Sequence, residues 1–327
     1  MTVVAERLSQ TILGEPQTHA NLTIYPLLGE SPQASDYELL DRALAKQWVR
    51  ITELTETGSV PELKFVNESD YTILLLDGEE LVGAKQNRIL NLTILAPPHK
   101  TIIIPVSCVE AGRWRTESKE FRSAERAHYA QGRARKVAQV SESLRYAGVR
   151  YSDQSEIWAD ISEKAARLGA RSKTGAAAAM YEKHRSSLRS YLKTFTVVER
   201  QVGAVFAVNG QVVGLDLFDS SQAFEGLLSK LVQSYALDAL DVPQPVTEVP
   251  SAGDIKAFMT EVAMAEVERF PAVGAGEDLR LTGDRLVGGA LELDGQVLHL
   301  CAFRLADASD STAGRRARAA VRRATRH

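Results

Sequence analysis

The residues best suited to chemistry begin beside the Asp77-Gly78 pair. Glu79 and Glu80 follow it at the start of an apolar segment, so they point to opposite faces of a predicted strand. Both faces are otherwise apolar, and we expect at least one of these carboxyl groups to lie near buried surface. Such a group can act as a general acid or base, or as a ligand of Mg²⁺ or Mn²⁺. The alternative is that both acids are solvated where the strand begins.

A run of polar side chains, from Lys85 to Arg88, then interrupts the apolar pattern. The amides of Gln86 and Asn87 can bind sugar hydroxyls, and the guanidinium of Arg88 can bind phosphate. This run predicts a recognition site, although an exposed loop would have the same composition.

A second run, "PVSCVEAGRWR", ends a very apolar segment at Arg115. Cys108 is a nucleophile only if a neighbouring base lowers its pKa, and a buried, inert thiol is the more common state of a lone cysteine. Glu110, Arg113 and Trp114 form a more credible group, because arginine binds phosphate and tryptophan stacks on a base. A structural ion pair beside a core tryptophan is the alternative.

A further acid, Asp216, shares one face of a predicted strand with Val212, Gly214 and Phe218. An ionised carboxyl group on an apolar face needs a partner, so the sequence predicts that Asp216 is paired or bound to metal. A hard cation would be held by carboxylates from the following set: Asp77, Glu79, Glu80 and Asp216. The six histidines never occur at metal-ligand spacing, and this argues against a zinc site. The motifs G-x-x-x-x-G-K-[ST], G-x-G-x-x-G and G-x-S-x-G are absent.

The elements that position these residues predict an α+β fold, with two antiparallel β-rich parts and a central helical insertion. The N-terminal part is sandwich-like, and the C-terminal part consists of a hairpin, two helices and a meander. Asn209-Gly210 and Asp77-Gly78 are both predicted as hairpin turns. The predicted division of the chain is 1–20, 21–116, 117–196, 197–305 and 306–327, with 21–305 forming one compact unit.

Helices are predicted within 36–47 with Asp36 as the cap, from about Ser123 to Gly148, over 153–170, from about Gly175 to Leu192, and in two segments ending near Leu240 and Phe270. At the start of the helix near Gly175, Thr174 is expected to act as an ordinary cap. A phosphate bound at the same helix start is the alternative.

The charge of the chain is unevenly distributed. The formal net charge is −3, yet residues 315–327 hold six arginines and no acid. This tail is either solvated or contacts an anionic partner such as nucleic acid. The chain shows no secretion signal, no membrane-length apolar run and only two cysteines, so we expect a cytoplasmic protein that does not enter the membrane.

Four runs carry a resemblance to a known family: "DGEELVGAKQNRIL", "PVSCVEAGRW", "VGAVFAVNGQVVGLDLFD" and "SYALDAL". Over roughly residues 21–305 the chain resembles a bacterial family named for its association with ADP-ribosylglycohydrolases and rhodanese-phosphatase proteins. The resemblance implies a link to ADP-ribose, NAD-derived nucleotides or RNA repair. It implies no catalytic role for any residue.

Together these observations suggest a cleft, lined by residues 77–88 and 108–114, that binds or processes an ADP-ribose-like nucleotide. Glu79 or Glu80 would supply acid–base chemistry or hold a metal, and Asp216 would complete the carboxylate group. Arg88 and Arg113 would bind phosphate. The alternative is a module without catalysis that binds a protein or a nucleotide signal.

Overall fold

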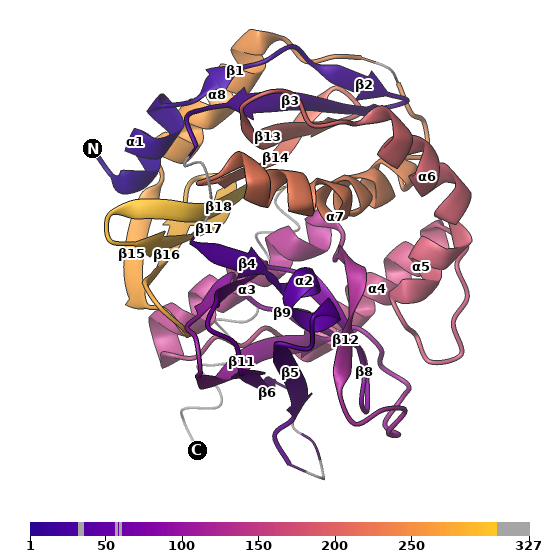
Figure 1. Cartoon of the computed structure of the whole chain (residues 1–327). Coiled ribbons are helices and arrows are strands. Elements are labelled where there is room, and N and C mark those ends of the chain that lie inside the picture. Colours follow the sequence, from indigo (N-terminus) through magenta and orange to yellow (C-terminus); the bar gives the residue numbers. More distant parts are fainter. Residues whose placement is uncertain (32–35, 56–57, 59–60, 247, 306–327) are drawn as a thin grey trace.

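The computed structural model describes residues 1–31, 36–55, 58, 61–246 and 248–305. Within these residues the chain forms eight helices and eighteen strands, which make up the predicted α+β fold. In Figure 1 the larger β-rich body occupies the upper half and the smaller one, formed by β4–β12, the lower half. The arginine-rich tail, 315–327, lies outside the described residues. None of the described helices has the length and apolar character needed to cross a bilayer.

The larger body is built on one nine-stranded sheet of order β1-β3-β13-β14-β18-β17-β16-β15, in which β2 also pairs with β3. Its strands are β1 (Ile12–Leu13), β2 (Gln17–His19), β3 (Leu22–Leu28), β13 (Gln201–Val208), β14 (Gln211–Phe218), β15 (Glu266–Pro271), β16 (Glu277–Thr282), β17 (Leu286–Leu293) and β18 (Gln296–Arg304). Strand β3 pairs with β13, so the first long strand of the chain joins the C-terminal strands.

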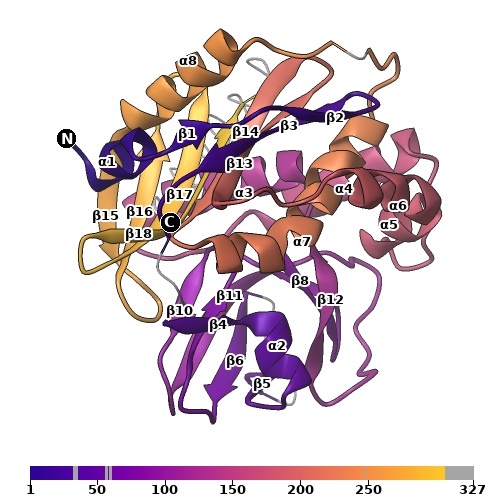
Figure 2. The ribbon, with the colours of Figure 1, turned by 45° about the horizontal axis from the view of Figure 1, so that its top comes forward.

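Helices cover both faces of this sheet, which explains why every residue of β13 is buried. Helices α1 (Val3–Ser9) and α8 (Ala252–Ala263) pack on one face and share a core with the sheet. Helix α7 (Ser221–Leu240) covers the other face, as Figure 2 shows. The hydroxyl of Ser220 caps α7, accepting a hydrogen bond from the amide of Ala223 at 3.1 Å.

The smaller body contains a six-stranded sheet of order β12-β8-β9-β11-β6-β5 and a three-stranded sheet of order β10-β7-β4. Its elements are β4 (Tyr37–Leu39), α2 (Leu40–Ala45), β5 (Val49–Glu53), β6 (Glu62–Asn67), β7 (Thr72–Leu75), β8 (Glu79–Gly83), β9 (Arg88–Leu90), β10 (Ile94–Ala96), β11 (Thr101–Cys108) and β12 (Phe121–Ala127). The two sheets and α2 enclose an apolar core of their own. The pairing of β4 with β7 is parallel.

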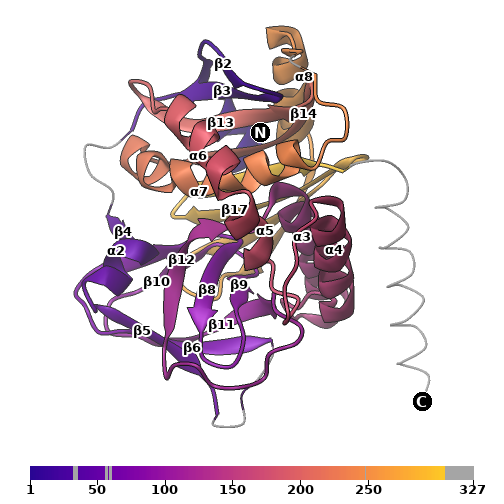
Figure 3. The same cartoon turned by 90° about the vertical axis from the view of Figure 1, so that its right-hand side faces the viewer.

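The helical insertion consists of α3 (Ala130–Ala147), α4 (Gln154–Arg167), α5 (Ala178–Lys183) and α6 (Arg185–Thr194). Helix α3 packs against β17 and β18 of the larger sheet, and α4 packs against β11 of the smaller one. The insertion therefore contacts both bodies, as Figure 3 shows from the side.

The sequence predicts two hairpin turns from Asx-Gly dipeptides, and the structure confirms one of them and contradicts the other. Asn209 and Gly210 both have positive φ, and they join β13 to β14 as predicted. At Asp77-Gly78 the predicted hairpin is wrong. Only Gly78 has positive φ, and β7 and β8 belong to different sheets. The turn therefore carries the chain from one sheet to the other.

Two predicted helices extend too far, because strand pairing takes part of each. Residues 121–127 form β12 against β8, so the helix expected from Ser123 begins only at Ala130. Residues 266–271 form β15 against β16, and α8 ends at Ala263. In both cases pairing with a neighbouring strand outweighs the local helical pattern.

Two predicted caps are also absent. Helix α2 begins after β4 with Leu39 at its N-cap, so Asp36 does not cap it. Thr174 does not cap α5, whose N-cap is Ala177, because its hydroxyl donates to Glu110 Oε1 at 2.7 Å. The helix expected from Gly175 is divided at His184 into α5 and α6.

Candidate functional site

Asp77 lies in a buried network of charges where α3 meets both β-rich bodies. Arg133 on α3 donates from Nε to Asp77 at 3.1 Å, and from Nη1 and Nη2 to Asp216 at 3.2 and 2.7 Å. Lys136 also pairs with Asp77, and the hydroxyl of Tyr235 donates to Asp216 at 3.0 Å. We call these five residues the Arg133 network.

Burial and charge act in opposite directions on the pKa values in this network. Burial alone would raise the pKa of Asp216, but Arg133 outweighs it and the pKa of Asp216 lies below its ordinary value. Burial would likewise lower the pKa of Arg133, whereas Asp216 and Asp77 raise it well above the ordinary value. The predicted pairing of Asp216 is therefore present, with an arginine as partner. It makes Asp216 a structural anion between the two bodies.

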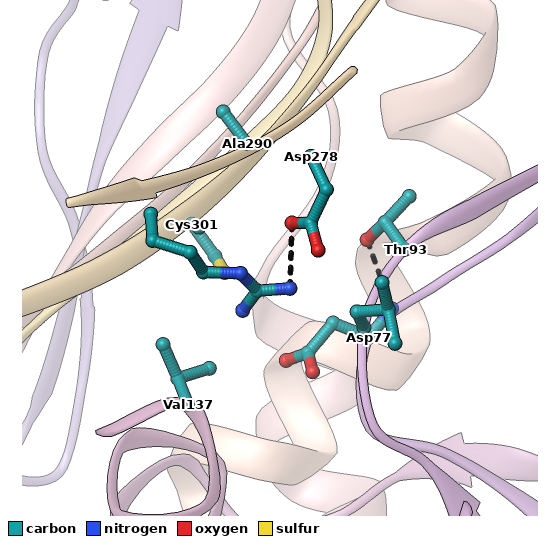
Figure 4. Close-up of a pocket in the computed structure, with 9 residues that line it drawn as sticks. Asp77, Thr93, Val137, Asp278, Ala290 and Cys301 are labelled. Carbon is teal, nitrogen blue, oxygen red and sulfur yellow. Dashed lines mark hydrogen bonds and ion pairs between the residues drawn. The ribbon is translucent and has the colours of Figure 1, made fainter. Parts of the chain in front are cut away.

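A small pocket beside this network measures about 10 Å³, which is room for one water molecule. Figure 4 shows Asp77 and Asp278 directing their carboxyl groups toward the same space, with Thr93 and Cys301 on its walls. Arg280 also lines the pocket, and it pairs with Asp278 at 2.6 Å. A nucleotide cannot enter a space of this size, so the pocket suits a structural water.

The other two candidate catalytic acids are buried and paired as well. Glu79 pairs with Lys230 of α7 and accepts a hydrogen bond from the amide of Leu76 at 2.8 Å. Its burial raises its pKa. The carboxylate of Glu80 accepts hydrogen bonds from Nε and Nη2 of Arg126 at 2.7 and 2.9 Å. Neither acid is solvated where β8 begins, and each has a cation as partner.

The polar residues of the two sequence runs do meet, at the ends of β8, β9 and β11. Strand β9 pairs with β8 on one side and with β11 on the other, so the segments that follow β8 and β11 lie together. We call the resulting group the Arg88–Arg113 cluster. It consists of Gln86, Asn87, Arg88, Glu110 and Arg113.

Hydrogen bonds join all five members of the Arg88–Arg113 cluster. Arg113 donates to Glu110 Oε2 at 2.8 Å and to Asn87 Oδ1 at 2.9 Å. Gln86 donates to the carbonyl of Glu110 at 2.9 Å and accepts from Arg88 Nη1 at 3.1 Å. Arg113 and Gln86 therefore use their polar groups to hold the loop together.

Arg88 is the exception in this cluster. Its exposed fraction is 0%, yet its Nε and Nη2 atoms have no hydrogen-bond partner among the described residues. The nearest acid, Glu53, pairs with Nη2 at a distance of 3.8 Å. Burial lowers the pKa of Arg88. A buried guanidinium with two unsatisfied donors is costly, by about 1–3 kcal/mol for each missing bond.

Trp114 lies beside Arg88 and is half-exposed, at 49%. The guanidinium carbon of Arg88 is 5.9 Å from the centre of its ring, and the ammonium of Lys85 is 5.4 Å from it. The ion pair of the structural alternative is present, because Arg113 pairs with Glu110 at 2.8 Å, but the expectation of a core tryptophan is wrong. An exposed aromatic ring beside two cations is suited to stacking on the base of an anionic nucleotide.

Cys108 is buried and unsuited to nucleophilic chemistry. Its thiol donates to Gln86 Oε1 at 3.0 Å, and its burial raises its pKa. The amide and carbonyl of Cys108 bond to the side chain of Gln154 on α4, both at 2.7 Å. The residue thus anchors β11 to the helical insertion.

The candidate residues form separate groups. Glu79 and Asp216 have no hydrogen bond or ion pair with the Arg88–Arg113 cluster in the described part of the chain. Within that part, no group of three or more His, Cys, Asp and Glu residues is arranged to hold a metal ion. The cations that neutralise the acids were missed from the sequence. They are Arg126, Arg133, Lys136 and Lys230. For Arg133 and Lys136 the signal was their spacing, which places both beside Ala130, Ala134 and Val137 on a buried helix face.

Comparison with known families matches residues 10–303 to the ARG and Rhodanese-Phosphatase-superfamily-associated Protein domain. The chain belongs to this family. The match spans both β-rich bodies and the helical insertion, and it includes the Arg88–Arg113 cluster. The family name records an association with ADP-ribosylglycohydrolases and states no reaction. No curated protein and no protein of known structure matches the chain.

Proposed function

We propose that this chain binds an ADP-ribose- or NAD-derived nucleotide at Arg88 and Trp114. The observation that carries the proposal is the buried guanidinium of Arg88, whose Nε and Nη2 atoms make no hydrogen bond to a described residue. Nε and Nη2 lie on one edge of a guanidinium, and this edge binds two oxygens of a phosphate at once. The oxygens of a diphosphate would accept hydrogen bonds from Nε and Nη2 of Arg88.

Trp114 would hold the base of the same ligand. Its ring is half-exposed and lies 5.9 Å from the guanidinium carbon of Arg88, so a base stacked on it would lie beside a phosphate held by Arg88. Stacking of a base on an aromatic ring contributes about 1–3 kcal/mol. The family's association with ADP-ribosylglycohydrolases favours an adenosine diphosphate over other phosphate ligands.

The pairing of the acids favours binding without turnover. Glu79, Glu80 and Asp216 each have a cationic partner, so none of them is free to accept a proton from water. We therefore prefer the alternative of a nucleotide-sensing module to that of a hydrolase. The predicted need for Mg²⁺ or Mn²⁺, and the anionic partner of the tail, stay predictions.

The test is titration calorimetry of the full chain with ADP-ribose, NAD and AMP, with and without Mg²⁺. We expect ADP-ribose to bind, and Trp114→Ala to weaken its binding by tenfold or more. Tyr146→Ala is the matched control, because Tyr146 is an aromatic residue of α3 that is 61% exposed. Both substitutions remove an exposed ring, so neither should unfold the protein.

Two results would decide against the proposal. One is the absence of binding by all three nucleotides, and the other is equal affinity of the two alanine variants for ADP-ribose. Chromatography of the ligand after incubation separates binding from turnover. Intact ADP-ribose supports a sensing module, whereas release of ribose phosphate or AMP shows a hydrolase.

A further inference from the structure

A second, larger pocket lies where β8 and β12 meet α5. Its volume is about 300 Å³, which is the size of a small-molecule site. The polar residues that line it are Asn87, Arg122, Ser123, Arg126 and Glu182. In Figure 3 β8 and β12 lie below α5. No role was predicted for this pocket from the sequence, because residues 123–126 were expected to be helical.

Arg126 forms a rigid part of the pocket wall. Its Nε and Nη2 atoms are held by the buried carboxylate of Glu80, and its guanidinium lies 5.0 Å from the centre of the Tyr181 ring. Tyr181 is fixed in turn, because its hydroxyl donates to the carbonyl of Ala127 at 2.9 Å. The Nη1 atom of Arg126 has no hydrogen bond to a described residue, so one donor of a pre-oriented arginine remains.

Arg122 supplies a cation that Glu80 does not neutralise. Its side chain is exposed and makes no ion pair or hydrogen bond with any described residue. Strand β12 carries more residues than β8 between the pairs Ser123–Leu81 and Ala127–Glu79. This irregularity widens the strand edge where both arginines line the pocket.

The remaining polar groups suit a hydroxylated ligand. Glu182 on α5 is exposed and can accept hydrogen bonds, and the hydroxyl of Ser123 can donate one. Asn87 Oδ1 is bound by Arg113, and no hydrogen bond joins its Nδ2 to a described residue. A pocket with free cationic donors and separate acceptors matches a compound that has both a phosphate and hydroxyl groups. Its volume also exceeds that of a phosphate alone.

We propose that this pocket binds a phosphorylated sugar, with Arg122 and Arg126 on the phosphate and Glu182 on the hydroxyl groups. The site shares Asn87 with the Arg88–Arg113 cluster, but neither Arg88 nor Trp114 lines it. Charge-assisted hydrogen bonds from arginine to phosphate are about twice as strong as neutral ones. Loss of Arg122 should therefore weaken binding by tenfold or more.

The experiment is titration calorimetry of the full chain with ribose 5-phosphate, ribose and inorganic phosphate. We expect ribose 5-phosphate to bind more tightly than either fragment. Arg122→Ala should weaken its binding by tenfold or more, and Glu182→Ala should weaken it without weakening the binding of inorganic phosphate. Arg189→Ala is the matched control, because Arg189 is an exposed arginine on α6 outside the pocket.

The proposal is overturned if ribose 5-phosphate does not bind, if Arg122→Ala and Arg189→Ala bind it equally, or if inorganic phosphate binds as tightly. The Trp114→Ala variant keeps the two sites apart. It should bind ribose 5-phosphate normally while it loses affinity for ADP-ribose. Failure at one site therefore does not imply failure at the other.

Discussion

Replacement of Arg133 by methionine tests whether the Arg133 network holds the two β-rich bodies together. Removing one partner of a buried ion pair costs about 3–5 kcal/mol, because the other charge stays buried. Here Asp77 keeps Lys136 as a partner, and Asp216 keeps only the hydroxyl of Tyr235 and the ring of His299. We therefore expect a loss near the lower limit, about 3 kcal/mol in the free energy of unfolding at pH 7.

Urea denaturation followed by circular dichroism measures this loss, and Asp216→Asn completes a double-mutant cycle with it. The double variant Arg133→Met/Asp216→Asn no longer contains the orphaned charge. Its loss in the free energy of unfolding should therefore be smaller than the sum of the two single losses, by about 1 kcal/mol or more. The reasoning is refuted if Arg133→Met costs less than about 1 kcal/mol, or if the two losses simply add.

Asp216 should make the stability of the parent protein and that of the Arg133→Met variant change with pH in opposite directions. In the parent protein the pKa of Asp216 is lowered on folding. Its contribution to stability is therefore present above the unfolded value near pH 4, and it is lost as the pH falls through the folded pKa. Without Arg133, burial raises the folded pKa of Asp216 above the unfolded value. The deficit of the Arg133→Met variant should then grow as the pH rises through that raised pKa, and shrink in acid.

Two further predictions concern buried groups. Cys108 and Cys301 are both buried, and burial raises the pKa of each thiol, that of Cys301 to about 12. Iodoacetamide at pH 8 should therefore leave both thiols unmodified in the folded protein and label both in urea, as measured by mass spectrometry. Rapid labelling of the folded protein would contradict the burial of these thiols. Gly78→Ala should cost more than the roughly 1 kcal/mol of a positive-φ glycine, because its Cβ would meet Arg133 at 2.9 Å. Gly148→Ala is the control in the same denaturation assay, since its φ is also positive and nothing lies within 4 Å, and equal losses would show that contact with Arg133 contributes nothing.

Local sequence signals were sufficient where the partner of a residue lies nearby in the chain. Asn209-Gly210 closes a hairpin whose two strands pair directly, so the dipeptide alone predicts the turn. The same reasoning fails at Asp77-Gly78, because β7 pairs with β10 and β4 while β8 pairs with β9 and β12. The choice of strand partner depends on the whole smaller body, and no pattern within residues 72–83 contains it.

The candidate site shows the same division. Polar residues between apolar strands correctly indicated that 86–88 and 110–113 are more than solvent-exposed loops, and the pairing of β9 with β11 brings them together. The sequence also placed Asp216 on an apolar face, where it needed a partner. It did not reveal that this partner is Arg133, because the two are joined only through the packing of α3 on the large sheet.

The position of β3 in the large sheet has a consequence for synthesis of the chain. Leu22–Leu28 is translated early, yet its partner β13 begins only at Gln201. At roughly 5–20 residues per second, about 10–35 s pass between the synthesis of β3 and the synthesis of β13. During that interval the smaller body, whose strands all lie within residues 37–127, can fold first. The large sheet closes last, around a strand that left the ribosome among the first. Until β13 is made, β3 can pair only with β1 and β2, and its open apolar edge is the kind of segment that chaperones protect.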